Sequence, residues 1–335
     1  PALRIALEAR PEKTVLEARP EKTVLEARPE KTGLEARPEK TALEAQPAPP
    51  AHMAAQAASA NIGLVASRRV SQGLIKRLAK EGYGAEALSR VRTPAGLDLG
   101  GDTLEEISLS ILAEILAADR GASALPLRMV KGGFADFSPA EAAPAGGTVG
   151  TVGAVGAAED GDAEPELLIV GMGRLAEELA RLGTLLGWRV TVNTSTGDPP
   201  DLPASARVVT GDLDFSRMEV GRRTYVIIAT LHKGDHLSMR KAMEGNAPYI
   251  GLIASQKRSG LVLDYLKETG VPETAMANVF APAGLELGAV TPAEIAISVI
   301  AEVVGVYRGG SCRPLSQVEA STGSGNPDAC LQLFE

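Results

Sequence analysis

The sequence predicts an α/β fold built on a doubly wound parallel sheet. Short apolar runs alternate with segments that have the apolar spacing of amphipathic helices, and glycine-containing turns separate them. Strands that alternate with helices favour a parallel sheet covered by helices on both faces. The same pattern occurs a second time, incomplete, earlier in the chain, behind a low-complexity segment. We therefore expect one full domain, preceded by a half domain and a tail.

The complete domain is expected over residues 164–310. Its strands are apolar runs that are too short for helices and are bounded by turn residues. We predict them at 167–170, 189–193, 207–210, 225–230 and 249–253. Apolar residues recur at helical spacing over 175–186 and from about 237 to 244. A last helix begins at Thr291-Pro292-Ala293-Glu294, a capping box in which threonine bonds the third helical amide and glutamate reaches back.

Residues 59–120 repeat the back half of this domain. The segment Ile62–Ser67 matches Ile250–Ser255, and the match continues without a gap at an offset of 188 positions. About 22 of roughly 55 positions are identical, far beyond chance for an internal repeat, and Thr103 keeps the capping box. The half copy packs on the full domain, completes a partner chain's domain, or is a remnant. An unpaired half would expose sheet edges and apolar surface, so we expect a homo-oligomer.

Three segments contain few residues that can form a core. Residues 1–58 contain a nine-residue unit, Leu-Glu-Ala-Arg-Pro-Glu-Lys-Thr-Val, whose charge and regular prolines predict a disordered tail. The first methionine is Met53, and the His-Met pair there resembles a cloning junction. Residues 121–163 are rich in Gly, Ala and Pro and are expected to form a flexible linker. Residues 311–335 are expected to form a C-terminal tail.

Composition excludes several classes of function. The formal net charge of -8 and the pI of about 5.2 give no electrostatic footprint for nucleic acid. The chain has no apolar run long enough to span a membrane, and no secretory signal. Two cysteines, Cys312 and Cys330, indicate a reduced, cytoplasmic protein rather than a disulfide scaffold.

A glycine motif lies where the first strand of the full domain meets its helix. Gly171-Met172-Gly173-Arg174-Leu175-Ala176 has the form G-x-G-x-x-A. Gly171 permits the tight turn, Gly173 lets backbone amides approach a pyrophosphate, and Ala176 lets the helix pack on the strand. The motif is typical of Rossmann nucleotide-binding domains when it follows a strand and opens a helix. A Rossmann scaffold without a ligand is the alternative.

Asn193 ends the second predicted strand, where NAD enzymes carry an acidic residue that binds the ribose hydroxyls. The missing carboxylate argues against ordinary NAD binding. An amide at this position admits a 2′-phosphate, but no arginine or lysine follows closely to pair with one. We still place Asn193 in the candidate cofactor site.

The loop after the fourth strand is expected to open onto the crevice above the strand ends. It contains Thr230, His232, Asp235 and His236. Thr230 and Asp235 are candidate cofactor contacts. A metal site at the two histidines would need a helical loop, which the glycine at 234 disfavours, and we assign no metal. Alternatively, Asp235 caps the next helix in a polar loop.

Ser255, Lys257 and Arg258 follow the fifth predicted strand, and Ser67-Arg68-Arg69 is the equivalent sequence in the half copy. A hydroxyl and two cations at a strand end suit an anionic ligand such as a phosphate. Solvated charges before a helix are the alternative. No catalytic residue is assigned anywhere in the chain.

With these residues assembled, the chain resembles the xanthine dehydrogenase accessory protein family (XdhC/CoxI), specifically its C-terminal Rossmann domain. The resemblance rests on the glycine motif, on Ala229-Thr230 with Asp235, and on the run from Tyr249 to Ser255. It continues through Ala281–Ala289, Thr291–Ala296 and Ser298–Glu302. The Ala-Ser segment is most similar to the CO dehydrogenase maturation branch.

The resemblance implies a maturation factor rather than an enzyme. Such a protein binds molybdenum cofactor, aids its sulfuration, and delivers it to the apoenzyme of a xanthine/CO dehydrogenase-type molybdenum hydroxylase. A cysteine desulfurase is an implied second partner. By the same resemblance, the cofactor's pterin, phosphate or nucleotide part lies across the strand ends. The alternatives are an NAD(P)-dependent oxidoreductase, with His232 as its proton donor, and a nucleotide-sensing or purely structural Rossmann module.

Overall fold

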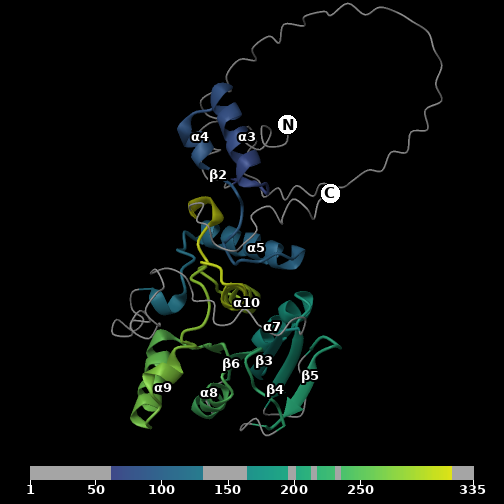
Figure 1. Cartoon of the computed structure of the whole chain (residues 1–335), viewed down its shortest axis with the longest axis vertical. Coiled ribbons are helices and arrows are strands. Elements are labelled where there is room, and N and C mark those ends of the chain that lie inside the picture. The colour runs from purple at the N-terminus through teal and green to yellow at the C-terminus, as the bar shows by residue number, and fades with distance from the viewer. Residues whose placement is uncertain (1–61, 131–163, 195–200, 213–216, 231–234, 319–335) are drawn as a thin grey trace, which may run out of the picture. The chain divides into compact units, whose positions relative to one another are not determined.

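A computed structural model describes residues 62–130, 164–194, 201–212, 217–230 and 235–318 (Figure 1). The nine-residue repeats, most of the expected linker, His232 and Cys330 lie outside these residues. No helix in the described part of the chain is long and apolar enough to cross a membrane.

Six parallel strands form the sheet of the full domain, in the order β5-β4-β3-β6-β7-β8. Their bounds are β3 Glu166–Gly171, β4 Arg189–Thr194, β5 Arg207–Thr210, β6 Thr224–Ala229, β7 Tyr249–Leu252 and β8 Val279–Phe280. The strands predicted from sequence are confirmed to within two residues, and β8 was not predicted. This order places the point where the winding reverses between β3 and β6, and ligands of doubly wound sheets bind there.

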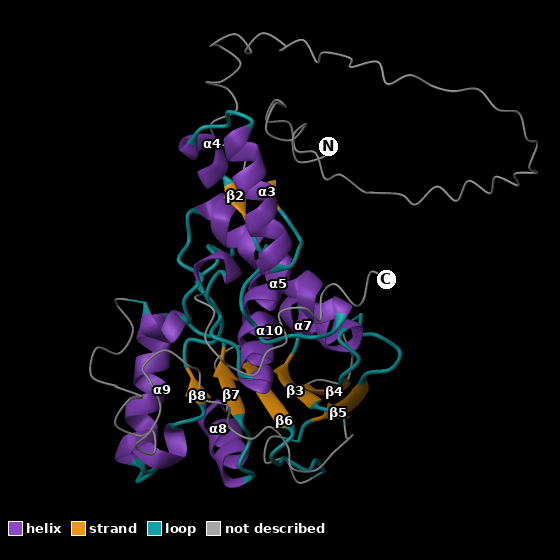
Figure 2. Cartoon of the chain, turned by 45° about the horizontal axis from the view of Figure 1, so that its top comes forward, coloured by secondary structure: helices purple, strands orange, loops and turns teal. Residues whose placement is uncertain are grey.

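Helices cover both faces of this sheet (Figure 2). Helices α7 (Arg174–Leu185) and α10 (Pro292–Arg308) pack on one face, and α8 (Asp235–Glu244) and α9 (Gln256–Glu268) on the other. Alternate residues of β3 divide between the two cores: Leu167 and Ile169 belong to the α7/α10 side, and Leu168 and Val170 to the α8/α9 side. The predicted α/β doubly wound fold is therefore confirmed.

The half copy reproduces the elements that follow β6 and α8 in the full domain. They are β1 (Ile62–Gly63), α3 (Arg68–Lys80), α4 (Ala85–Ser89), β2 (Val91–Arg92), α5 (Leu104–Arg120) and the short 3-10 helix η1 (Leu127–Met129). In the full domain, η2 (Glu273–Met276) stands at the position of α4, and η3 (Leu315–Gln317) at that of η1. Helices α5 and α10 both have 17 residues, and each begins with the predicted capping box.

Each copy ends in an exchanged tail, a segment that pairs with the other copy. The exchanged tails are residues 122–130 after α5 and 310–318 after α10. Leu97 bridges to Pro314, and Leu285, its equivalent, bridges to Pro126. The two pairings are related like the two halves of a symmetric dimer contact. The half copy therefore packs on the full domain in the position of a second subunit.

The backbone hydrogen bonds of the tails repeat the same symmetry. The Asp98 N–H donates to the Arg313 carbonyl at 2.7 Å, and the equivalent Glu286 N–H donates to the Leu125 carbonyl at 2.7 Å. The linker predicted over 121–163 and the tail predicted over 311–335 stay predictions, since most of both segments lies outside the described residues. Residues 122–130 and 311–318 are ordered parts of the repeat because the other copy satisfies their backbone groups.

Candidate cofactor-binding crevice

The switch point between β3 and β6 depends on Gly171. The backbone there has φ +152°, and a Cβ atom would collide with the carbonyl oxygen of Ala229 on β6. Glycine therefore lets the two strands remain side by side at their carboxyl ends. This is the tight turn that the sequence motif predicts.

Gly173 opens helix α7 and faces empty space. It is the N-cap residue with φ 84°, and a Cβ atom built there meets nothing within 4 Å. The first backbone N–H groups of a helix have no partner inside the helix, and the helix dipole makes this end positive. Ala176, one turn later, is fully buried against the sheet. The motif thus forms an open turn at the positive end of α7, backed by the close packing of Ala176.

Other predicted site residues extend along the same edge of the sheet. Thr230 directly follows β6. Ser255 is the N-cap of α9 and accepts a hydrogen bond from the Arg258 N–H at 3.4 Å. Lys257 is exposed and Arg258 is half-buried. Because the carboxyl ends of parallel strands share one edge, these residues belong to the same side of the sheet as Gly173.

Asn193 does not have the role suggested by its sequence position. It is 3% exposed at the end of β4, and its side-chain amide donates to the Asp212 carbonyl at 2.5 Å. The side chain fixes the chain segment after β5 against β4 rather than offering a polar group to a ligand. Its partner lies 19 residues away, so no local sequence signal predicts the contact.

Only the two ends of the loop between β6 and α8 belong to the described residues. Asp235 is the first residue of α8, but the position of its side chain lies outside the described structure, as does His232. The His236 ring lies 5.0 Å from the Tyr265 ring, edge to face. The described residues contain no group of three metal-binding side chains.

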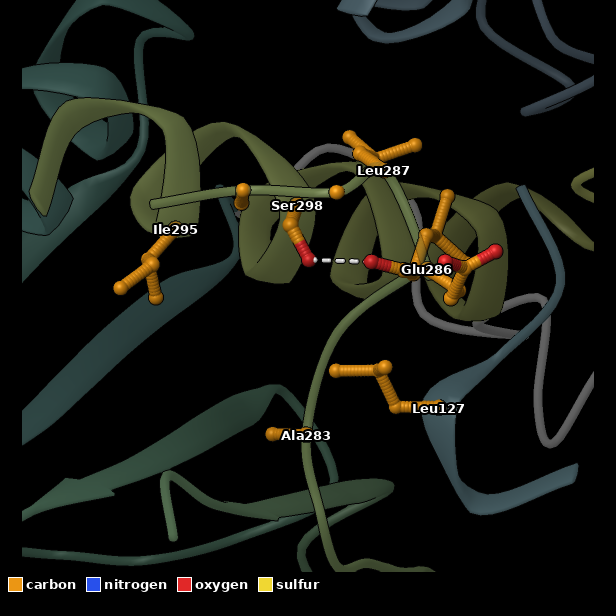
Figure 3. Close-up of a pocket in the computed structure, with 9 residues that line it drawn as sticks. Leu127, Ala283, Glu286, Leu287, Ile295 and Ser298 are labelled. Carbon is orange, nitrogen blue, oxygen red and sulfur yellow. Dashed lines mark hydrogen bonds between the residues drawn. The ribbon is translucent and has the colours of Figure 1, made fainter. Parts of the chain in front are cut away.

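A cavity of about 180 Å³ lies where the first exchanged tail meets the full domain (Figure 3). Leu127 of the tail faces Ala283, Leu287 and Ile295, and the Ser298 hydroxyl donates to the Leu285 carbonyl at 2.7 Å. None of the predicted site residues lines this cavity. Its walls are mainly apolar, so it belongs to the packing between the copies.

A buried polar cluster lies where the first exchanged tail meets the full domain, and it was not predicted from the sequence. Glu302 of α10 is fully buried and accepts hydrogen bonds from the Tyr249 hydroxyl and the Gly284 N–H, both at 2.7 Å. Arg128, from the first exchanged tail, places its guanidinium 3.8 Å from the centroid of the Phe280 ring. The half copy therefore contributes a cation to the interior of the full domain. A carboxylate within the apolar sequence of α10 was the available signal.

Burial controls the ionisation of this cluster. It raises the pKa of Glu302 to about 7, although the charge of Arg128 and the two hydrogen bonds oppose the shift. It lowers the pKa of Arg128 and raises the pKa of Tyr249 well above its ordinary value. Burial also raises the pKa of the Cys312 thiol, and the Glu302 and Asp98 carboxylates add to that rise. Cys312 is therefore a protonated thiol rather than a nucleophile.

The sheet order and the glycine turn define a Rossmann protein, in which ligands are expected at the β3/β6 switch point. The family model of the XdhC Rossmann domain matches residues 5–115 and 167–303. The chain belongs to this family. The sequence prediction of the family is thereby confirmed, while its assignment to the CO dehydrogenase branch stays a prediction.

Two known proteins are similar over part of the chain. The protein described as "Uncharacterized protein YqeB", from Escherichia coli strain K12, is 32% identical over 148 residues, 42% of this chain. The matched part is 27% of the length of YqeB, so the chain spans about a quarter of that relative. A crystal structure described as a xanthine dehydrogenase from Bacillus halodurans is 24% identical, with a TM-score of 0.37, over 48% of this chain and 45% of that one.

Proposed function

We propose that this chain is an accessory protein that binds molybdenum cofactor in the crevice and aids its sulfuration and insertion into a xanthine/CO dehydrogenase-type enzyme. The observation that carries the proposal is the open first turn of α7 at Gly173, in a chain of the XdhC Rossmann family. The cofactor's phosphate or nucleotide part would accept N–H groups of that turn. Lys257 and Arg258 would supply charge near it, and no bond making by these residues is implied.

The state of Asn193 supports a ligand other than NAD. Asn193 carries an amide where dinucleotide-binding domains carry a carboxylate for the ribose hydroxyls, and the N–H of that amide is already engaged with the Asp212 carbonyl. The proposed partner is the apoenzyme of a molybdenum hydroxylase in the cytoplasm, of the CO dehydrogenase branch, with a cysteine desulfurase for the sulfuration step.

Anaerobic binding of molybdenum cofactor to the purified full chain tests the proposal, with NADH, NADPH and cytidine nucleotides as comparators. We expect selective retention of the molybdopterin. Gly173→Asp should weaken it at least about tenfold, because a carboxylate at the positive end of α7 competes with the ligand's phosphate.

Gly187→Asp is the matched control. Gly187 also has a positive φ, 76°, with nothing within 4 Å of a Cβ atom, but it lies between the end of α7 and the start of β4. Gly187→Asp also places a carboxylate at a glycine with positive φ, but at the opposite edge of the sheet, so its cofactor affinity should remain that of the wild type. Binding of NADPH without molybdopterin, or equal losses in both variants, would refute the proposal.

A further inference from the structure

The half copy contains a pocket that the crevice does not explain. Its volume is about 360 Å³, within the roughly 300–1,000 Å³ of small-molecule sites. It lies between α3, the turn after β2 and the second exchanged tail. Its lining residues are Arg68, Ser71, Gln72, Ile75, Lys76, Thr93, Pro94, Leu315, Ser316 and Val318.

The lining combines two cations with hydroxyl groups. Among the residues that the structure describes, neither Arg68 nor Lys76 pairs with a carboxylate, and no acidic residue lines the pocket. Ser71 is 2% exposed, and its hydroxyl oxygen accepts a hydrogen bond from the Thr93 hydroxyl at 2.6 Å. The pocket therefore has a buried polar wall and uncompensated positive charge.

The equivalent positions in the full domain provide an internal comparison. The residues 188 positions after Arg68 and Lys76 are Gln256 and Asp264, so the half copy has two cations where the full domain has an amide and a carboxylate. The equivalent of Ser316 is Arg128, whose long side chain reaches the Phe280 ring. The small side chain of Ser316 leaves the pocket open, whereas an arginine would extend into it. Arg68 and Lys76 on α3 make the pocket positively charged.

We propose that the half copy binds a small phosphorylated anion in this pocket, at a site separate from the Rossmann crevice. Several acceptor oxygens on a phosphoryl group match the planar donors of Arg68, the ammonium of Lys76 and the nearby hydroxyls. The pocket exceeds the size of one phosphate, so a pyrophosphate or a phosphate ester of modest size fits it better than the free ion.

Calorimetric titration of the full chain tests this site with four probes: inorganic phosphate, pyrophosphate, cytidine monophosphate and citrate. The protein carries Gly173→Asp, so that the crevice does not contribute, and wild type is titrated in parallel. We expect saturable pyrophosphate binding that weakens with added salt. Citrate is the comparator for charge alone and should bind at least about tenfold more weakly, because it lacks a compact phosphoryl group whose oxygens reach Arg68, Lys76 and the hydroxyls together.

Three variants in that background locate the site. Arg68→Gln with Lys76→Asp installs the residues of the full domain and should weaken pyrophosphate binding at least about tenfold. Ser316→Trp fills the pocket without changing its charge and should do the same. Arg77→Gln is the control, because Arg77 is on the same helix, its side chain is 78% exposed, and it does not line the pocket.

Loss of binding in the first two variants, with retention in Arg77→Gln, supports the site. The proposal is overturned if pyrophosphate does not bind at millimolar concentration, if citrate binds equally well, or if all three variants behave alike. Because all variants share the Gly173→Asp background, differences among them do not depend on whether the residues around Gly173 bind molybdenum cofactor.

Discussion

Glu302 is a buried carboxyl group with two hydrogen-bond donors. The Tyr249 hydroxyl and the Gly284 N–H both donate to one of its oxygens, while its other oxygen is buried and has no partner among the described residues. A buried oxygen of this kind is costly when the group is charged. The fold therefore favours the protonated acid, and the pKa of about 7 places the change within the physiological pH range.

The sign of the pH dependence follows from this shift. The pKa of Glu302 is about 7 in the folded protein and near 4.5 in the unfolded chain. Between these values the folded state binds more protons, so this group's contribution to the free energy of unfolding falls as pH rises from about 4.5 to 7. Glu302→Gln should remove that fall and stabilise the protein above pH 7 by up to roughly 3 kcal/mol.

Thermal denaturation from pH 5 to 8.5 measures this effect. Glu114→Gln is the matched control, since Glu114 is the equivalent carboxylate of the half copy and accepts from the Gly96 N–H at 2.7 Å. Burial also raises the pKa of Glu114, but Arg92 stands 3.7 Å away. Its substitution should change the pH profile less. Identical profiles for Glu302→Gln and wild type would contradict the assignment.

At the scale of residues, sequence reasoning worked where the chemistry is local. Gly171 and Gly173 were predictable because a strand, a tight turn and a helix follow one another within the motif. The role of Asn193 was not predictable, because the amide bonds a carbonyl 19 residues away. Arg128 was missed for the same reason: its surroundings are supplied by residues from Tyr249 onward.

At the scale of elements, α5 and α10 are held together by two related sets of ion pairs. The Arg308 Nε lies 2.9 Å from Glu106 and its Nη2 lies 2.8 Å from Asp102. The equivalent Arg120 Nη2 lies 3.0 Å from Glu294. The environments differ, because the Glu106 side chain is 2% exposed and that of Glu294 is 17% exposed.

Arg308→Met should therefore destabilise the protein more than Arg120→Met. Removing Arg308 leaves the buried Glu106 charge without its cation, at a cost of about 3 kcal/mol. Both glutamates keep the backbone amides of their capping boxes, but Glu294 also keeps access to water, so Arg120→Met should cost less than Arg308→Met. Urea denaturation of the two variants measures the difference, and equal midpoints would count against it.

Elements could be predicted from the sequence where their hydrogen-bond partners are local. The capping boxes at Thr103 and Thr291 satisfy their own helix ends, so the starts of α5 and α10 could be read from the chain. The two-residue strand β8 and the exchanged tails have too few residues to show a period. The hydrogen-bond partners of their backbone groups are distant in sequence, so these segments take their structure from tertiary contacts.

At the scale of the whole molecule, the described part of the half copy, from residue 62 to 130, has no counterpart of α7. In the full domain, Ile300 and Val303 of α10 are fully buried on the side of the core that contains α7. Their equivalents on α5, Leu112 and Ile115, are 49% and 56% exposed. A surface that one copy buries is thus left open on the other, as expected for half of a domain.

Self-association of the full chain, predicted from sequence, can now be tested at this surface. The Leu112→Lys/Ile115→Lys double variant should shift the chain from dimer to monomer in light scattering after size-exclusion chromatography, because charges replace buried apolar contact. Leu261→Lys is the control, since Leu261 is 64% exposed on α9 of the full domain. A wild-type chain that is monomeric at high concentration would refute the prediction.

The exchange of tails has a further consequence because both copies belong to one polypeptide. Separate subunits joined by such a contact would come apart on dilution. Here the two surfaces belong to one chain, so their contact is intramolecular and does not require two molecules to meet. Arg128 therefore remains in the interior of the full domain at any protein concentration, and a contact usually governed by mass action becomes a fixed part of the fold.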